Sequence, residues 1–177
     1  MHVTLLTAQS LDGFITRHDE AGSRFTSKED KTHFRAALAG FDCGVMGGVT
    51  YRGASDWIQA QVAAPHRLCV VLTRTPGRQA ADARPGALEF TDAPPEKILA
   101  GLQARGFARC AVLGGAQVHG LFLAARLVDE LWLTVEPVLF GGGTPLVATP
   151  VEVRLELLSQ EKLNAAGTLL LRYRVVR

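Results

Sequence analysis

The sequence is poor in three features that would quickly assign a chain to a class: one-sided charge, paired cysteines and long apolar runs. Its 19 Lys and Arg residues nearly balance 17 Asp and Glu residues, for a formal net charge of +2, and no long block of like charge occurs. Bulk charge therefore gives little support to a nucleic-acid partner or to membrane binding. The apolar run at the N-terminus soon meets Asp12, which argues against a secretory signal and a membrane-spanning helix.

The three cysteines, Cys43, Cys69 and Cys110, are isolated and odd in number. No Cys-x-x-Cys pair exists, which argues against a disulfide framework and a cysteine zinc site, and we predict no metal site. Each cysteine lies in an apolar, strand-like run, where a buried, inert thiol is expected. Such a chain is expected in the cytoplasm. With 177 residues, 47% of them hydrophobic, residues 1–177 are predicted to form a single domain with a sizeable core.

Strand-like and helix-like segments alternate through most of the chain, and strands alone finish it. This order predicts an α/β fold: a three-layer α/β/α domain with a mixed, largely parallel sheet and antiparallel C-terminal strands. The predicted strands are 2–9, 41–48, 67–74, 87–92, 108–115, 128–140, 151–163 and 167–177, and the predicted helices are 27–40, 49–58, 94–106 and 116–127.

Two of these strands end in paired glycines directly before a helix, at Gly47-Gly48 and at Gly114-Gly115. Open α/β sheets bind ligands at the carboxyl ends of their parallel strands, where the next helix offers free backbone N–H groups. Glycines would let a phosphate approach that backbone closely, and two such loops could grip one pyrophosphate. A tight turn or a close helix–strand contact explains each pair as well, and neither matches a G-x-G-x-x-G fingerprint.

Six motifs in order give the chain a family resemblance. They are Ser10-Leu11-Asp12-Gly13, Val45 to Tyr51 (VMGGVTY), Val71 to Arg74 (VLTR), Val112 to Gly115 (VLGG), Leu127 to Leu131 (LVDEL) and Glu136 to Gly143 (EPVLFGGG). The set resembles dihydrofolate reductase-like proteins, and more closely the RibD C-terminal, pyrimidine reductase branch of that superfamily. The resemblance covers nearly the whole chain and implies the dihydrofolate reductase-like fold.

The resemblance also implies a cofactor, NADPH, and residues that hold it. The two glycine loops would bind the pyrophosphate, and Thr73 with Arg74 would meet the adenosine 2′-phosphate, which a guanidinium can bind bidentately. Without the resemblance, the sequence around Arg74 favours a solvated residue in a turn. The implied pyrophosphate loops comprise Gly47, Gly48 and Thr50 in the first and Gly114, Gly115, Ala116 and Gln117 in the second.

One position departs from the family pattern. The arginine expected in the family's Gly-Arg-x-Thr loop is Gly48 in this sequence. One phosphate contact is therefore missing or is supplied from elsewhere, for which Arg52 is a candidate.

The substrate side rests on four polar residues. Asp30 resembles the acidic residue with which folate reductases hold the pterin ring, but it also fits the N-terminus of a helix that begins after Ser27. Asp12 is a candidate for the nicotinamide pocket or for an Asp-Gly turn. His33 and Arg35, on the same helix as Asp30, are candidates for a substrate phosphate or for a solvated helix face. Asp30 and Asp12 are the candidate catalytic residues.

The function that the resemblance implies is an NADPH-dependent reductase. It would transfer a hydride to a C=N carbon of a pyrimidine or pterin-type substrate, most like the 5-amino-6-(5-phosphoribosylamino)uracil reductase of riboflavin biosynthesis. Two alternatives stay open: dihydrofolate reductase activity, and a non-catalytic nucleotide-binding module. The expected partner is a small-molecule substrate. A homodimer is a further expectation, because the apolar run LLLRYRVV suits a contact between copies, although an internal core strand explains it as well.

Overall fold

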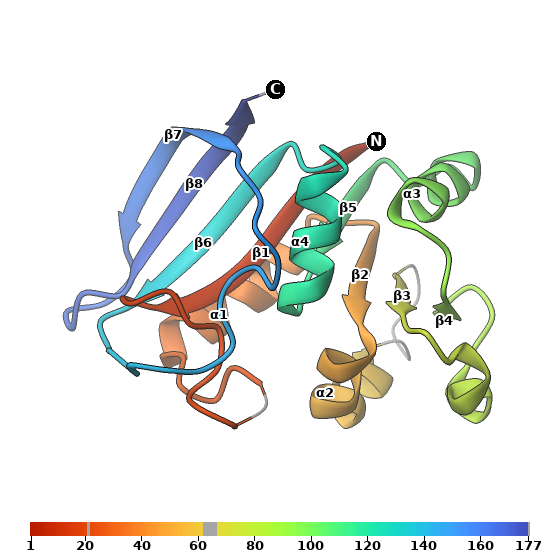
Figure 1. Cartoon of the computed structure of the whole chain (residues 1–177), viewed down its shortest axis with the longest axis horizontal. Coiled ribbons are helices and arrows are strands. Elements are labelled where there is room, and N and C mark those ends of the chain that lie inside the picture. The colour runs from red at the N-terminus through yellow and green to blue at the C-terminus, as the bar shows by residue number, and fades with distance from the viewer. Residues whose placement is uncertain (21, 62–66, 177) are drawn as a thin grey trace.

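A single mixed sheet organises the chain, with helices on both of its faces (Figure 1). The computed structural model describes residues 1–20, 22–61 and 67–176. The single-domain prediction for 1–177 also covers the few residues outside these ranges and stays a prediction. In the described residues, the strands are β1 (His2–Ser10), β2 (Cys43–Gly47), β3 (Leu68–Leu72), β4 (Leu88–Thr91), β5 (Arg109–Val112), β6 (Glu130–Glu136), β7 (Arg154–Lys162) and β8 (Leu169–Val176). The helices are α1 (Lys28–Leu38), α2 (Gly48–Gln61), α3 (Pro95–Ala104) and α4 (Ala116–Ala124), with a 3-10 helix, η1, at Pro76–Asp82.

The strand order confirms the predicted fold class. The sheet runs β4-β3-β2-β5-β1-β6-β8-β7, and the six strands from β4 to β6 pair in parallel. β8 pairs antiparallel with β6, and β7 antiparallel with β8. The turn between these last two strands is held by Asn164, whose Oδ1 accepts hydrogen bonds from the backbone N–H groups of Gly167 and Thr168. The prediction of an antiparallel C-terminal pair is therefore correct.

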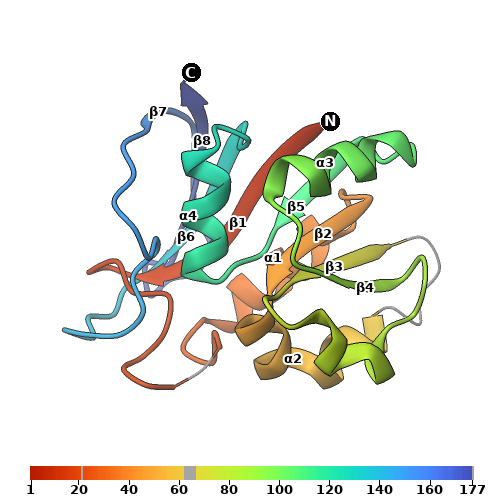
Figure 2. The same ribbon diagram turned by 45° about the vertical axis from the view of Figure 1, so that its right-hand side comes forward.

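Side chains that alternate along the strands build a core on each face of the sheet. Val45 packs with side chains of α3 and α4 such as Phe122, whereas the next residue, Met46, packs with Ile58 of α2. α1 lies on the same side as α2, and Leu113 belongs to the apolar clusters of both helices (Figure 2). These are the three layers that the sequence predicts.

The cysteines are part of this core. Cys43 and Cys110 are buried in the cluster that α3 and α4 cover, and burial raises the pKa of the Cys69 thiol to about 12. The expectation of inert thiols agrees with this environment.

The outer edge of the sheet is the most exposed part of the strand system. Every residue of β7 is exposed, including Leu155, Leu157 and Leu158. The homodimer stays a prediction, for which this strand offers an apolar surface. No helix in the described residues is both long and apolar enough to cross a bilayer.

Candidate active site

A large cleft opens at the carboxyl ends of the parallel strands. It has a volume of about 2060 Å³, whereas pockets for one drug-sized ligand typically take ~300–1,000 Å³. Residues at or directly after the ends of β2, β3, β4 and β5 line it, together with residues within β1 and β6. The carboxyl ends of parallel strands are where open α/β sheets bind ligands. The cleft therefore has room for a dinucleotide and a second molecule.

The predicted site residues collect in this one cleft. It is lined by Asp30, His33, Arg35, Gly47, Gly48, Thr50, Thr73, Arg74, Gly114, Gly115, Ala116 and Gln117. Asp12 is the predicted site residue that does not line it.

The two glycine loops touch each other across the cleft floor. The Gly47 N–H donates to the Gly114 carbonyl at 2.6 Å. A Cβ atom on Gly47 would lie 3.6 Å from the Gly115 nitrogen, and one on Gly115 would lie 3.2 Å from Thr50 Oγ1. Gly114 has a φ of +106°, a backbone conformation that residues with a side chain rarely adopt. The glycine pairs therefore do make the close contact that the sequence offered as one explanation. This contact brings the starts of α2 and α4 next to each other.

The start of α4 suits an anion. Gly115 is its N-cap residue and provides no side-chain oxygen, so the first backbone N–H groups of the helix receive no side-chain cap. Such N–H groups, at the positive end of the helix dipole, bind phosphates. Together with Thr50 across the floor, this cradle, which a Cβ atom would fill, fits the pyrophosphate of a dinucleotide.

Arg52 lies close to Gly48, the residue that stands where the family pattern has an arginine. A Cβ atom on Gly48 would lie 3.4 Å from Arg52 Nη1 and 3.2 Å from Thr73 Oγ1. The Arg52 guanidinium therefore lies beside the point where the side chain of the family's arginine would begin. Arg52 lines the cleft with Arg74, which is exposed. A cationic side chain is thus present at this end of the cleft, from a position one helical turn later.

Asp30 is buried at another wall of the cleft, in the first turn of α1. The Ser27 side chain caps the helix by accepting from the Asp30 N–H at 3.2 Å. In a capping box the third helical residue would return a bond to the cap residue's N–H, but the Ser27 N–H donates to Glu136 Oε1 at 2.7 Å. Glu136 thus takes that partner, and the Asp30 carboxyl does not accept from the cap residue's N–H.

The Asp30 carboxyl lies in a polar recess of the sheet. Asp30 is 7% exposed, and burial raises its pKa, although hydrogen bonds from the Thr134 and Thr26 hydroxyls act in the opposite direction. The negative Glu136 nearby raises it further. Glu136 in turn accepts from Thr168 Oγ1 at 2.7 Å. A carboxyl held in this way can accept from a ring amidine or carry a proton.

His33 and Arg35 lie on the same helix, at the cleft wall. Burial lowers the pKa of the half-buried His33 imidazole, and the positive Arg172 lowers it further, against the opposite effect of Asp30. A neutral imidazole is a weak partner for a phosphate, so this environment speaks against that role for His33. Arg35 is exposed and stays a candidate.

Asp12 lies in a turn, which is one of the two roles that the sequence left open for it: the Gly13 N–H donates to the Ser10 carbonyl at 3.0 Å. The Asp12 carboxylate accepts from Ser10 Oγ at 2.5 Å and from the backbone N–H groups of Phe140 and Gly141 at 3.0 and 2.7 Å. These bonds, with the Ser10 bond contributing most, lower its pKa. Asp12 therefore ties the end of β1 to the loop that follows β6, outside the cleft. Its catalytic and substrate-binding roles stay predictions, which these contacts do not favour.

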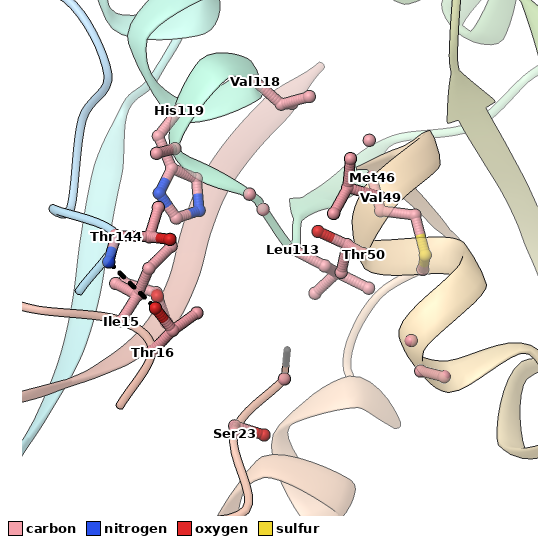
Figure 3. Close-up of a pocket in the computed structure, with 18 of the residues that line it drawn as sticks. Ile15, Thr16, Ser23, Met46, Val49, Thr50, Leu113, Val118, His119 and Thr144 are labelled. Carbon is pink, nitrogen blue, oxygen red and sulfur yellow. Dashed lines mark hydrogen bonds between the residues drawn. The ribbon is translucent and has the colours of Figure 1, made fainter. Parts of the chain in front are cut away.

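The glycine run 141–143 forms part of the cleft wall. Gly142, Gly143 and Thr144 line the cleft beside Ile15 and Thr16. The Thr144 N–H donates to Thr16 Oγ1 at 2.8 Å (Figure 3), and a Cβ atom on Gly143 would collide with the Thr16 carbonyl oxygen. The glycine run thus permits a close fit between two loops far apart in sequence.

His119 is a cleft residue that the sequence reasoning missed. It is fully buried, and burial lowers its pKa to about 4. Its Nδ1 lies 2.8 Å from the Leu146 carbonyl oxygen, whereas its Nε2 has no hydrogen-bond partner among the described residues. An unpaired buried acceptor costs about 1–3 kcal/mol. His119 lies four residues after Gly115, about one helical turn. This spacing could have predicted that its side chain lies on the same side of α4 as Gly115. Thr134 was missed too, although a threonine in the otherwise apolar run LWLTV stands out.

In the described residues, no group of three or more His, Cys, Asp or Glu side chains is arranged to hold a metal ion.

Comparison with solved structures places the fold. A pyrimidine reductase-like protein of Corynebacterium diphtheriae superposes with a TM-score of 0.77 at 19% identity, over 99% of this chain and 92% of that one. A diaminohydroxyphosphoribosylaminopyrimidine deaminase/5-amino-6-(5-phosphoribosylamino)uracil reductase of Thermotoga maritima gives 0.76 at 17% identity, over 99% of this chain and 56% of that one. Dihydrofolate reductase of Enterococcus faecalis, solved with NADP(H), gives 0.70 at 20%, over 99% and 97%. The fold is therefore dihydrofolate reductase-like.

The family follows from the sequence itself. No curated protein matches the chain significantly. The family model of the RibD C-terminal domain matches residues 1–168. The chain belongs to the RibD C-terminal domain family, a family of reductases.

Proposed function

We propose that the protein is an NADPH-dependent reductase that transfers a hydride to a pyrimidine or pterin-type substrate. One observation carries the proposal: a single cleft joins an anion cradle built from two glycine loops to a buried carboxyl, that of Asp30. The cradle suits a dinucleotide, and the carboxyl suits a nitrogen heterocycle. The volume of the cleft suits both at once.

The residues that line the cleft suggest which of them would hold each part of NADPH. Arg74, Thr73 and Arg52 would hold the 2′-phosphate of the adenosine half, and the helix starts at Gly48 and Ala116 would hold the pyrophosphate. Ile15 and His119, which also line the cleft, would contact the nicotinamide half. NADPH, when bound, supplies the hydride, and the protein orients the two reactants and excludes water.

The substrate half depends on Asp30 and Thr134. A carboxylate paired with a hydroxyl can hold the N–H groups of a ring amidine through charge-assisted hydrogen bonds. Because burial raises the pKa of Asp30, its carboxyl can also hold a proton for the nitrogen that gains one after hydride transfer. Arg35, exposed at the cleft wall, is available for a substrate phosphate.

Two substrates are the main candidates. The names of the similar proteins support 5-amino-6-(5-phosphoribosylamino)uracil, and thus a step of riboflavin biosynthesis. The buried Asp30 next to Thr134 favours dihydrofolate as the second candidate, because a pterin ring carries an amidine. A non-catalytic nucleotide-binding module is the remaining alternative.

The test is cofactor oxidation measured with purified protein and both substrates. We expect NADPH to be consumed with one of them, and NADPH to be preferred to NADH. Turnover of dihydrofolate alone would replace the riboflavin assignment. Saturable NADPH binding without turnover of either would favour the binding module, and no binding at all would refute the proposal.

A further inference from the structure

The tautomer of His119 can be derived from one contact. Its Nδ1 lies 2.8 Å from the Leu146 carbonyl oxygen, and a carbonyl can only accept a hydrogen bond. Nδ1 must therefore carry the proton and donate it. The imidazole is neutral, so Nε2 carries a lone pair and can only accept. This atom is buried, and no residue in the part of the chain that the structure describes is hydrogen-bonded to it.

The His119 side chain is packed into the wall of the cleft. His119 lines the cleft, and its Nε2 would lie 3.1 Å from a Cβ atom on Gly114. Figure 3 shows the ring beside Thr144, Ile15 and Thr16, across the opening from Thr50 and Val49.

We propose that His119 is a positioning residue whose Nε2 accepts a hydrogen bond from the nicotinamide half of the bound cofactor. The donor would be a carboxamide N–H or a ribose hydroxyl, both of which this half carries. The inference rests on the proposed function, because it requires a nicotinamide dinucleotide in the cleft. It goes beyond that function by assigning a cofactor contact to a residue outside the implied cradle.

The alternative is a structural histidine that only ties α4 to the loop at Leu146. That role needs Nδ1 alone and leaves Nε2 without a purpose. A buried acceptor is normally paired in folded proteins, so an unpaired one inside a ligand cleft indicates a partner that arrives with the ligand. The two roles therefore use different atoms and can be separated.

Two substitutions separate them. In His119→Asn, the amide nitrogen takes the place of Nδ1 and can donate to Leu146, but nothing takes the place of Nε2. In His119→Gln, the amide reaches the place of Nε2 and can present its oxygen as an acceptor. Binding of NADPH and of 2′,5′-ADP, which lacks the nicotinamide half, is measured by calorimetry on wild type and both variants. Thermal unfolding is recorded for each.

The expected result is specific to one ligand and one variant. His119→Asn binds NADPH about three- to tenfold more weakly, the range of one lost hydrogen bond. It binds 2′,5′-ADP as wild type does and unfolds at nearly the same temperature. His119→Gln keeps most of the NADPH affinity. Equal NADPH binding by wild type and the Asn variant would overturn the inference, and so would an equal loss for both ligands.

A measurement on the wild-type protein covers the case in which the variants fail to fold. The Nε2 nitrogen resonance of His119 is followed by NMR as ligand is added. A shift with NADPH and none with 2′,5′-ADP supports the contact, whereas the absence of a shift with NADPH overturns it. Using 3-acetylpyridine adenine dinucleotide phosphate, which lacks the carboxamide N–H, distinguishes the donors: a retained shift identifies the ribose hydroxyl, and a lost one the carboxamide. If wild type binds no NADPH, the proposed function itself fails.

Discussion

Thr50 Oγ1 lies 3.2 Å from the point where a Cβ atom on Gly115 would stand. A residue of the first glycine loop thus closes the space above the second. Gly115→Ala is expected to push Thr50 away and narrow the cradle, and to weaken NADPH binding about tenfold or more, which corresponds to ~1.4 kcal/mol. A fluorescence titration with NADPH measures this change.

The matched control for that substitution is Gly101→Ala. Gly101 lies in α3, where an added Cβ atom would meet no atom within 4 Å. The same chemical change there should leave cofactor affinity intact and stabilise the helix by about 0.5–1 kcal/mol. If both variants bind NADPH like wild type, the glycine loops are turns and not a cradle.

Arg52 and Arg74 are predicted to set the preference for NADPH. Because hydrogen bonds to charged groups contribute about 1.5–3 kcal/mol, removing either arginine should weaken NADPH binding by ~10–100-fold. NADH, which lacks the 2′-phosphate, should be affected little. Affinities for the two cofactors are compared in Arg52→Ala, Arg74→Ala and the control Arg154→Ala, whose residue lies on β7, away from the cleft. An equal loss for NADH and NADPH would contradict the assignment.

Asp30→Asn tests the substrate carboxyl. Loss of a group that both orients the ring and holds a proton should lower kcat/KM by about 10²–10⁴-fold, while NADPH affinity stays unchanged. Steady-state kinetics across pH provides the measurement. A variant with the same turnover and pH profile as wild type would remove Asp30 from the mechanism.

The same substitution should stabilise the fold at neutral pH. The pKa of Asp30 is raised above its ordinary value of 3.8, chiefly by burial, so the folded state prefers the protonated form. Its stability contribution is full below pH 3.8 and is lost as pH rises through the folded pKa. The gain in Asp30→Asn should therefore appear at pH 7 and shrink as pH falls toward 3.8. Urea unfolding at both pH values checks this, and a destabilised variant at pH 7 would contradict it.

Asp12 is predicted to hold the loop that follows β6 in place and to take no part in hydride transfer. Asp12→Ala removes the acceptor for the Phe140 and Gly141 N–H groups, so these amides should exchange with solvent faster. Hydrogen exchange followed by mass spectrometry reports on this segment. A loss of kcat as large as that of Asp30→Asn, with no change in exchange, would restore Asp12 as a catalytic candidate.

Much of the fold could be predicted because the alternation of apolar and polar residues, the helix caps and the glycine turns each shape the backbone within a few residues. The β-α order gave the sheet type, and the cleft position followed from where parallel strands end. The strand predicted at 128–140 stops at Glu136, since Pro137 lacks the N–H that a ladder requires. The 3-10 helix at Pro76–Asp82 was not predicted. Both differences are local.

The site was less predictable because its roles depend on contacts across the sheet. Nothing near Asp30 in sequence shows that Glu136 takes the Ser27 N–H in place of the Asp30 carboxyl. The contacts of Asp12 could not be predicted for the same reason: its partners Phe140 and Gly141 are almost 130 residues away. His119 was missed because its significance lies in one unpaired atom, which only the packed structure shows.

His119 should also give the protein an acid-sensitive stability. Its folded pKa of about 4 lies below the ordinary value of 6.5, so above pH 6.5 both states are neutral and stability is full. Between pH 6.5 and 4 the unfolded chain binds a proton that the folded protein refuses, and stability falls by up to about 3 kcal/mol. In His119→Gln this loss is absent, so stability should fall less between pH 7 and 4 than in wild type. Urea unfolding across that range measures the difference, and parallel curves would mean that the imidazole takes up its proton without cost to the fold.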